Sequence, residues 1–214
     1  IFAWGIRKTI INKSLTLMQL MDNAPHDFCV NHEEQDLKKL LGFCHRTFND
    51  TDLLYFISFF KFHYTNHSSL ETAFFNDKTI SSANPADQNI ESALNCFYDY
   101  FFSLEDVPNR TLKHIAAPKK NSACKRLNMY LRWMVRDDHN GVDFGIWKTV
   151  SPSNLICPID VHVARVARKF GLLTRNQVDL LAAEELTNTL RKFDKNDPAK
   201  YDFALFSLGV LERF

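Results

Sequence analysis

The chain has 214 residues, a formal net charge of +1 and 45% apolar residues, which is enough for one large domain around a real core. Its 19 Phe and only 6 Gly argue against Gly-rich phosphate loops and turn-rich β architecture. No apolar run reaches the roughly 18 residues of a membrane span, so we expect no membrane association. The five cysteines form no CxxC pair, which favours a reducing cytoplasm over a disulfide frame or a zinc site: Cys29, Cys44, Cys96, Cys124 and Cys157.

The first half of the chain shows helical periodicity. Apolar residues repeat at helical spacing from Ile6 to Met21, and Asn31 and Glu34 have the spacing of a capping box before a short helix. Further expected segments are a central helix introduced by Asp50-Thr51-Asp52, a short helix over 68–75, a mobile loop over 76–88 and a helix over 90–104.

The second half continues in the same way. We expect helices over 123–135, after a cap at Asp160, after a cap at Thr174, and from Asp197-Pro198 to Gly209. No strand is expected, so the prediction is an all-α fold. We expect a single domain in two lobes, with 25–120 as the central lobe and 1–24 plus 121–214 as the second. Ile1 is not a natural start, which predicts a truncated N-terminus.

The charges are unevenly distributed. Two stretches contain bases but no acid, 107–136 and 161–178, whereas 71–106 holds seven acids and one lysine. One face should therefore be basic and another acidic, and local potential matters more for binding than the sum. A solvated helical surface explains a basic run equally well.

Lys125 and Asp160 are the candidate chemical groups. Lys125 starts a helix, where the dipole disfavours a second cation, so its ammonium should lose a proton more readily. A neutral amine can attack C1′ of a nucleotide and form a Schiff base. Taken alone, however, Lys125 reads as a surface lysine, Asp160 as a helix cap, and the neighbouring His162 as structural.

The pattern around both residues resembles a known superfamily. The segment P-I-D-V-H-V-A-R-V-A-R-K-F-G is similar to the V-D-T-H-x-x-R-V segment of helix-hairpin-helix DNA glycosylases of the endonuclease III (HhH-GPD) superfamily. That resemblance implies a two-lobed helical bundle with Asp160 as the catalytic carboxylate. It places the superfamily's lysine at Lys125, in S-A-C-K-R-L-N-M-Y-L. A-W-G-I-R-K resembles the wedge region, which makes Trp4 a candidate wedge.

Almost the whole chain resembles a bacterial family of unknown function within this superfamily, through H-R-T-F, G-V-D-F-G-I-W and the segments above. Lys125 and Asp160 lie 35 positions apart (160 − 125), a long connector similar to that of archaeal 8-oxoguanine glycosylases. The hairpin A-P-K-K-N-S-A lacks the two glycines that bind a DNA phosphate. Asn121 can adopt a positive φ and replace one of them.

Other sites are weaker. His63 and His67 lie one helical turn apart without a third zinc ligand. Cys124 beside Lys125 could have a lowered pKa, but no His or Asp lies near it in sequence. His162 is a candidate for the base pocket, and Trp133 and Trp147 are candidates to stack on a flipped base, although a structural role is the more common one for each.

The sequence therefore predicts a DNA base-excision glycosylase with lyase activity on an oxidised purine. It would be a cytoplasmic, nucleoid-associated monomer that binds damaged double-stranded DNA without a cofactor or metal. Residues expected to hold the DNA backbone are Lys119, Lys120, Asn121, Arg126, Arg165 and Arg168. The alternative is a helix-hairpin-helix domain that binds DNA without cutting it, which the missing hairpin glycine favours.

Overall fold

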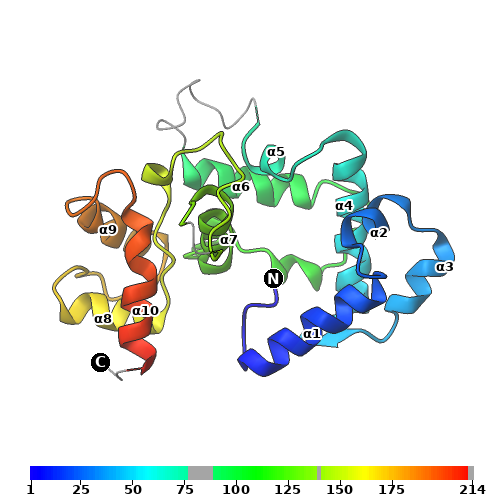
Figure 1. Ribbon diagram of the computed structural model, residues 1–214, viewed down its shortest axis with the longest axis horizontal. Helices are drawn as coiled ribbons and strands as arrows, with labels where there is room; N and C mark the ends of the chain where they lie inside the picture. The colour runs from blue at the N-terminus through cyan, green and yellow to red at the C-terminus, as the bar shows by residue number, and fades with distance from the viewer. Residues whose placement is uncertain (77–88, 139–140, 212–214) are drawn as a thin grey trace. The chain divides into compact units, whose positions relative to one another are not determined.

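The computed structural model describes residues 1–76, 89–138 and 141–211 (Figure 1). These residues are mostly helical, as the periodicity predicted. The exception is a small antiparallel hairpin of β1 (Cys44–His45) and β2 (Phe48–Asn49), paired through Cys44 with Asn49 and His45 with Phe48. Most of the segment predicted as a mobile loop, 77–88, lies outside the described residues.

The chain divides into two compact units, and their boundaries differ from the expected lobes. Unit 1 is Ile1–Ala73 with Asp99–Ile115, and unit 2 is Phe74–Tyr98 with Ala116–Phe214. The N-terminal segment belongs to unit 1 because its aromatic rings pack there. Phe2 contacts Phe43 at 5.8 Å and Phe48 at 5.3 Å between ring centroids.

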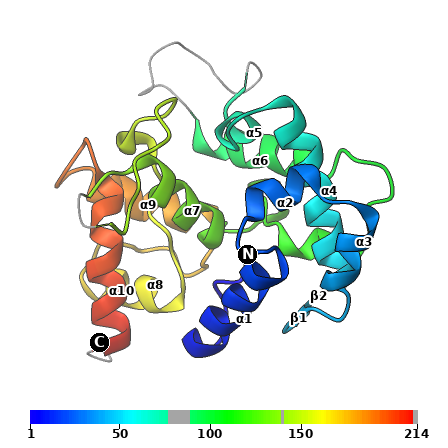
Figure 2. The same ribbon diagram turned by 45° about the vertical axis from the view of Figure 1, so that its right-hand side comes forward.

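Unit 1 is built around α4. Its helices are α1 (Arg7–Leu20), α2 (Pro25–Asn31), α3 (Glu34–Leu37), η1 (Lys38–Leu40), α4 (Asp50–Asn66) and η3 (Thr111–His114), as Figure 2 shows from a second side. As expected for a helix that is apolar nearly all round, α4 is largely buried; Phe59 is fully enclosed and contacts Phe101 at 4.4 Å. Its N-cap is Asn49, which forms a capping box with Asp52.

The buried carboxylate of Asp52 joins α4 to η3. It accepts hydrogen bonds from Thr111 Oγ1 at 2.8 Å and Asn49 N at 3.0 Å, and His114 Nε2 lies 3.1 Å away. Burial raises the pKa of Asp52, but these hydrogen bonds and the charges of His114 and Arg110 outweigh it and leave the pKa below its ordinary value. Asp52 is therefore a satisfied buried anion that fixes one end of unit 1.

Unit 2 contains α7 (Lys125–Val135), α8 (Val161–Lys169), α9 (Leu180–Leu190), η6 (Pro198–Tyr201) and α10 (Asp202–Leu211), together with short 3-10 turns η4 (Pro118–Lys120) and η5 (Pro152–Asn154). Helices α8 and α10 pack side by side (Figures 1 and 2). Gly209 lies inside α10, not at its end as predicted. A Cβ at this position would approach His162 Cβ to 3.1 Å, so the close packing against α8 favours glycine here. Helices α5 (Glu71–Phe74) and α6 (Ile90–Phe101) span the sequence boundary of the units.

Two predicted helix starts are wrong. Asn31 is the last residue of α2, and the capping box of α3 pairs Glu33 with Asp36. Helix α9 is capped by Asp179, whose side chain accepts from Ala182 N, whereas Thr174 donates to Glu185 at 2.6 Å. In both places several polar residues could serve as a cap, and tertiary contacts decided which one does.

We predict that Asp52→Ala lowers the free energy of unfolding by about 3 kcal/mol, because it leaves Thr111 and His114 buried without their acceptor. Urea denaturation of the variant and the wild type measures this. Glu105→Ala, which removes an exposed carboxylate of the same unit, is the control and should change the value by less than about 0.5 kcal/mol. Equal effects of the two substitutions would contradict the assignment.

Candidate active site

Lys125 is placed by the tight turn that precedes α7. Asn121 adopts φ 58°, the left-handed conformation that the sequence analysis allowed for it, and Cys124 adopts φ 49° as the residue before the helix. Ser122 Oγ accepts a hydrogen bond from Cys124 N at 3.1 Å. Two left-handed residues within four positions turn the chain sharply, so that α7 starts at Lys125. The first turn of this helix contains no acidic residue.

Asp160 caps α8, and its two carboxylate oxygens have separate partners. Oδ1 accepts hydrogen bonds from the backbone N–H groups of His162 and Val163, both at 2.9 Å. Oδ2 accepts a hydrogen bond from Lys125 Nζ at 2.6 Å. Because Oδ1 is fixed by the helix, Oδ2 is held in one direction toward the amine.

The pair is partly open to solvent. The Lys125 side chain is 33% exposed and that of Asp160 is 19% exposed. Burial raises the pKa of Asp160, but the Lys125 hydrogen bond, the two backbone N–H groups and the lysine charge outweigh it, so the pKa lies below its ordinary range. At neutral pH Asp160 is therefore an anion, able to accept a proton from Lys125 and to stabilise positive charge close by.

The structure adds two residues that the sequence analysis did not select, Asp202 and Phe206. Both lie on α10, and the Phe206 ring centroid is 5.4 Å from Lys125 Nζ. Burial raises the pKa of Asp202 to about 6; the charges of Arg132 and Lys125 oppose this rise, and those of Asp160 and Asp143 add to it. In sequence, Asp202 reads only as the acid that follows a proline turn, and Phe206 as one of many phenylalanines.

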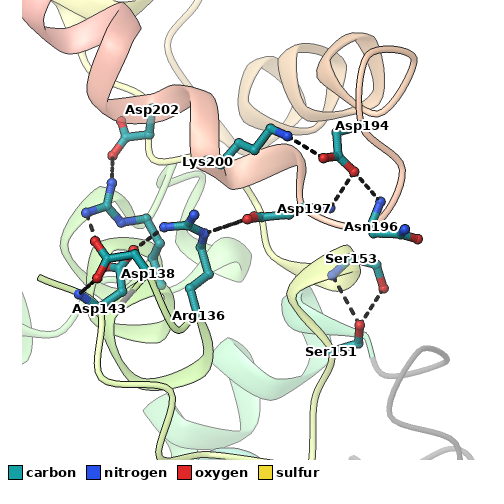
Figure 3. Close-up of polar contacts among 11 residues, drawn as sticks. Arg136, Asp138, Asp143, Ser151, Ser153, Asp194, Asn196, Asp197, Lys200 and Asp202 are labelled. Atoms are coloured by element: carbon teal, nitrogen blue, oxygen red, sulfur yellow. Dashed lines mark hydrogen bonds and ion pairs between the residues drawn. The ribbon is translucent and has the colours of Figure 1, made fainter. Parts of the chain in front are cut away.

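A buried set of ion pairs joins Arg132 of α7 and Arg136, the residue after it, to Asp202 of α10, to Asp143 and to Asp197. Arg132 Nη1 bonds Asp202 Oδ2 at 2.9 Å, and Arg132 Nη2 lies 3.3 Å from Asp143. One helical turn on, Arg136 pairs with Asp143 and with Asp197 at 2.9 Å (Figure 3). Both arginines belong to the stretch predicted to form a basic surface. They are used internally, and this corrects that expectation for these two residues.

The two hairpin lysines gather on one tyrosine. Lys119 Nζ lies 5.0 Å and Lys120 Nζ 4.5 Å from the centroid of the Tyr98 ring, and Lys120 also bonds the Tyr98 hydroxyl. Asn95 anchors the turn, since its side-chain oxygen accepts from Lys119 N at 3.0 Å. Both lysines are exposed, and with Asn121 they present two cations and a left-handed turn on one surface.

The three predicted backbone-binding arginines are more constrained. Arg165 Nη2 donates to Gly209 O at 2.7 Å, and Arg126 is half-buried, which lowers its pKa from the usual value. Arg168 donates to Arg175 O at 2.9 Å and to Asn176 O at 2.7 Å, so it holds the loop before α9. The structure therefore gives Arg168 a structural task that the sequence did not suggest.

The residues predicted for the base pocket differ in their burial and contacts. Trp147 is 3% exposed and packs on Phe74 and Tyr130, which makes it a core residue, the structural role that the sequence favoured over stacking on a base. Trp133 is half-buried. His162 is the second residue of α8, two positions after the Asp160 cap, and its Nδ1 is buried without a hydrogen-bond partner.

Trp4 lies in unit 1, edge-on to His45 at 5.9 Å. Lys125 belongs to unit 2, and the wedge role of Trp4 stays a prediction.

Thiol and metal chemistry receive little support from the described residues. Burial raises the pKa of Cys124 to about 11, against the small lowering effect of the Ser122 hydrogen bond, so the sequence-based possibility of a lowered pKa is wrong. His63 is buried between Tyr100 and the carbonyl of Ser69. Within 1–76, 89–138 and 141–211, no three His, Cys, Asp or Glu side chains are placed to hold a metal ion. In the same ranges, every helix falls short of the length and apolar character needed to cross a bilayer.

Residues 1–211 match the family described as "Protein of unknown function (DUF2400)". The chain belongs to this family. No curated protein and no solved structure matches it.

We predict a specific pH dependence of stability from Asp202. In the folded protein the pKa of Asp202 is about 6, whereas the ordinary pKa of this carboxyl group is 3.8. Its contribution to the free energy of unfolding is thus fully present below the ordinary pKa. It is lost as the pH rises through the folded value, by about 2–3 kcal/mol.

The measurement compares wild type with Asp202→Asn by urea denaturation at several pH values. The free energy of unfolding of the wild type minus that of the variant should fall by that amount between about pH 4 and about pH 7. The constant offset caused by the lost Arg132 bond does not enter this comparison. A difference that is flat with pH would contradict the raised pKa.

Proposed function

We propose that this chain is a DNA glycosylase with an associated lyase activity that excises an oxidised purine such as 8-oxoguanine. The observation that carries the proposal is the 2.6 Å contact between Lys125 Nζ and Asp160 Oδ2 at the starts of two helices. The resemblance of both segments to helix-hairpin-helix glycosylases supports it. The family match is neutral, because the description of the family states no activity.

The proposed reaction uses both groups. Lys125 gives its proton to Asp160, and the free amine attacks C1′ of the nucleotide. The C1′–N bond breaks, the electron pair leaves with the base, and the base takes up a proton. Ring opening of the sugar then yields a Schiff base on Lys125, from which β-elimination cleaves the strand. Asp160 passes the proton it received on to the departing base, and the carboxylate anion that this restores stabilises the positive charge that develops on the sugar.

The surroundings of Lys125 fit a base that has left the stack. Phe206 is 37% exposed and its ring lies 5.4 Å from the amine, so it offers a face for stacking next to the nucleophile. Flipping a base costs a few kcal/mol, and less for a mispaired or damaged one. Lys119 and Lys120, both exposed, would contact the DNA backbone, which predicts binding that weakens with salt.

A second candidate function is DNA binding without base excision. The hairpin before α7 has one left-handed position at Asn121 and no glycine, so it offers less backbone to a phosphate than a Gly-containing hairpin. In this alternative the Lys125–Asp160 pair only fixes the helix starts. The following experiments separate the two candidates.

We predict that the wild type forms a covalent adduct with duplex DNA containing 8-oxoguanine in the presence of borohydride, and that Lys125→Gln does not. The reason is that reduction of the Schiff base between the Lys125 amine and the sugar makes this protein–DNA bond permanent, and glutamine has no amine with which to form it. Gel electrophoresis of labelled DNA shows the adduct. Lys192→Gln, which removes an exposed lysine at the end of α9, is the matched control and should trap like the wild type. Trapping by Lys125→Gln would remove Lys125 from the mechanism.

We also predict that Asp160→Asn slows single-turnover base release by about 100-fold or more, the usual contribution of a positioned proton acceptor. The amide oxygen still caps α8, since Asn and Asp are similar N-caps, so the melting temperature should change little. DNA affinity, measured by fluorescence anisotropy, should stay within a few-fold of wild type. Base release at the wild-type rate would support the alternative role of Asp160 as a cap alone. Absence of release and adduct from the wild type over a panel of lesions would favour the non-catalytic candidate.

A further inference from the structure

Arg46 occupies an unusual backbone position in unit 1. It is the first of the two residues, Arg46 and Thr47, that connect β1 to β2, and its φ is 57°. The first central position of such a two-residue hairpin commonly takes glycine, and a long side chain there is uncommon and costs free energy. A strained residue of this kind persists only when its surroundings fix it, and such positions are concentrated at functional sites.

The surroundings do fix Arg46. Its guanidinium lies over the Trp4 ring, 4.6 Å from the centroid. Gly5 makes room for it, because a Cβ at Gly5 would come within 2.7 Å of Arg46 Nη1, and the φ of +102° at Gly5 also requires glycine. On the other side of the turn, Arg110 donates to Thr47 O at 2.9 Å. The stacked guanidinium is thus held in place before any ligand arrives.

The hydrogen-bonding groups here are available. Within the described residues, the Arg46 side chain has no ion pair or hydrogen bond, although it stacks on Trp4. Three buried ring nitrogens beside it also have no hydrogen-bond partner: Nε1 of Trp4 and both nitrogens of His45, a residue that is 1% exposed. Buried polar groups are nearly always paired, so these nitrogens mark the Trp4, His45 and Arg46 cluster as a place where hydrogen bonding is incomplete, with the exposed Arg46 guanidinium as the group open to a ligand.

The start of α1 adds to the same site. Helix α1 begins at Arg7, two residues after Gly5, with no side-chain cap and no acid in its first turn, and its first residues are Arg7 and Lys8. Cations at a helix N-terminus oppose the helix dipole, whereas an anion there is stabilised by the free N–H groups. The Arg46 guanidinium, which lies against Gly5 two residues before this helix end, is therefore at a position where an anion is favoured.

We propose that Arg46, stacked on Trp4 beside the first turn of α1, is a phosphate-binding site of unit 1 and that its ligand is a backbone phosphate of DNA. The planar guanidinium suits the phosphate group, and its stacking on Trp4 reduces the entropy lost on binding. The choice of DNA as the carrier of the phosphate rests on the proposed function; the anion site itself does not. Trp4 then acts as the platform for Arg46, a different task from that of a wedge.

The test is binding of undamaged duplex DNA at several salt concentrations by the full chain and Arg46→Asn. Asparagine tolerates the left-handed conformation, so the variant should melt at or above the wild-type temperature. It should nevertheless bind about threefold to tenfold more weakly, and the slope of log Kd against log salt should fall by about one. Lys38→Gln, which removes an exposed cation of the same unit, is the control and should leave the slope unchanged. An Arg46→Asn slope equal to that of the control overturns the proposal.

Two further measurements separate the sources of the phosphate and the two proposals. The indole N–H resonance of Trp4, assigned with Trp4→Phe, should shift on addition of DNA. A shift with inorganic phosphate as well shows a site for the free anion, and the absence of a shift with DNA overturns the proposal. Because undamaged DNA is used, a reduced slope in Arg46→Asn supports the site even if the wild type forms no borohydride adduct. In a trapping enzyme, Arg46→Asn should still form the adduct at saturating DNA.

Discussion

The hydrogen bond from Lys125 to Asp160 is the interaction on which the candidate site depends. It works because the carboxylate is shared between two tasks: one oxygen satisfies the first N–H groups of α8, and the other faces the amine at 2.6 Å. The hydrogen bonds of the helix cap thereby hold the proton-accepting oxygen in a fixed position. Any shift in the start of α8 would move the acceptor away from the amine, so the packing of that helix is a condition for the proposed chemistry.

That packing is secured by charge as well as by apolar contacts. Arg132 lies in α7 and Arg136 directly follows this helix. Together they bind Asp202, Asp143 and Asp197, so the helix that starts with Lys125 is tied to α10 and to the segments that carry Asp143 and Asp197 (Figure 3). Buried ion pairs add little net stability because desolvation is costly, but they specify one arrangement. Here they specify the position of Lys125 relative to Phe206 and Asp202. The cost is visible in Asp202, whose raised pKa shows that its burial is only partly compensated by Arg132.

Unit 1 uses the same principle for a different purpose. Asp52 fixes η3 to α4, and Arg110, 3.2 Å from Asp52, reaches the hairpin turn at Thr47. The buried anion thus supports, through one arginine, the strained turn that presents Arg46. A rigid support stabilises the strained backbone of the exposed Arg46, and it fixes the orientation of the guanidinium before an anion binds. Unit 2 thus presents a cation at the start of α7 and unit 1 presents one in the hairpin turn, and in both units buried charged groups fix the backbone that carries the cation.

The sequence by itself determined the helical class and most helix positions, because periodicity and caps act locally: α4 and α8 start where Asp50 and Asp160 indicated. It also selected Lys125 and Asp160, through segments whose residue types resemble those of a known superfamily. Only the tertiary structure decided which cations are exposed. The local sequence around Arg132, Arg136 and Arg168 does not distinguish them from surface arginines, because their hydrogen-bond partners lie in other segments of the chain. It likewise buried Trp147, brought Phe206 and Asp202 to Lys125, and stacked Arg46 on Trp4. Those outcomes depend on contacts between residues far apart in the chain, and such contacts leave no periodic signal to read.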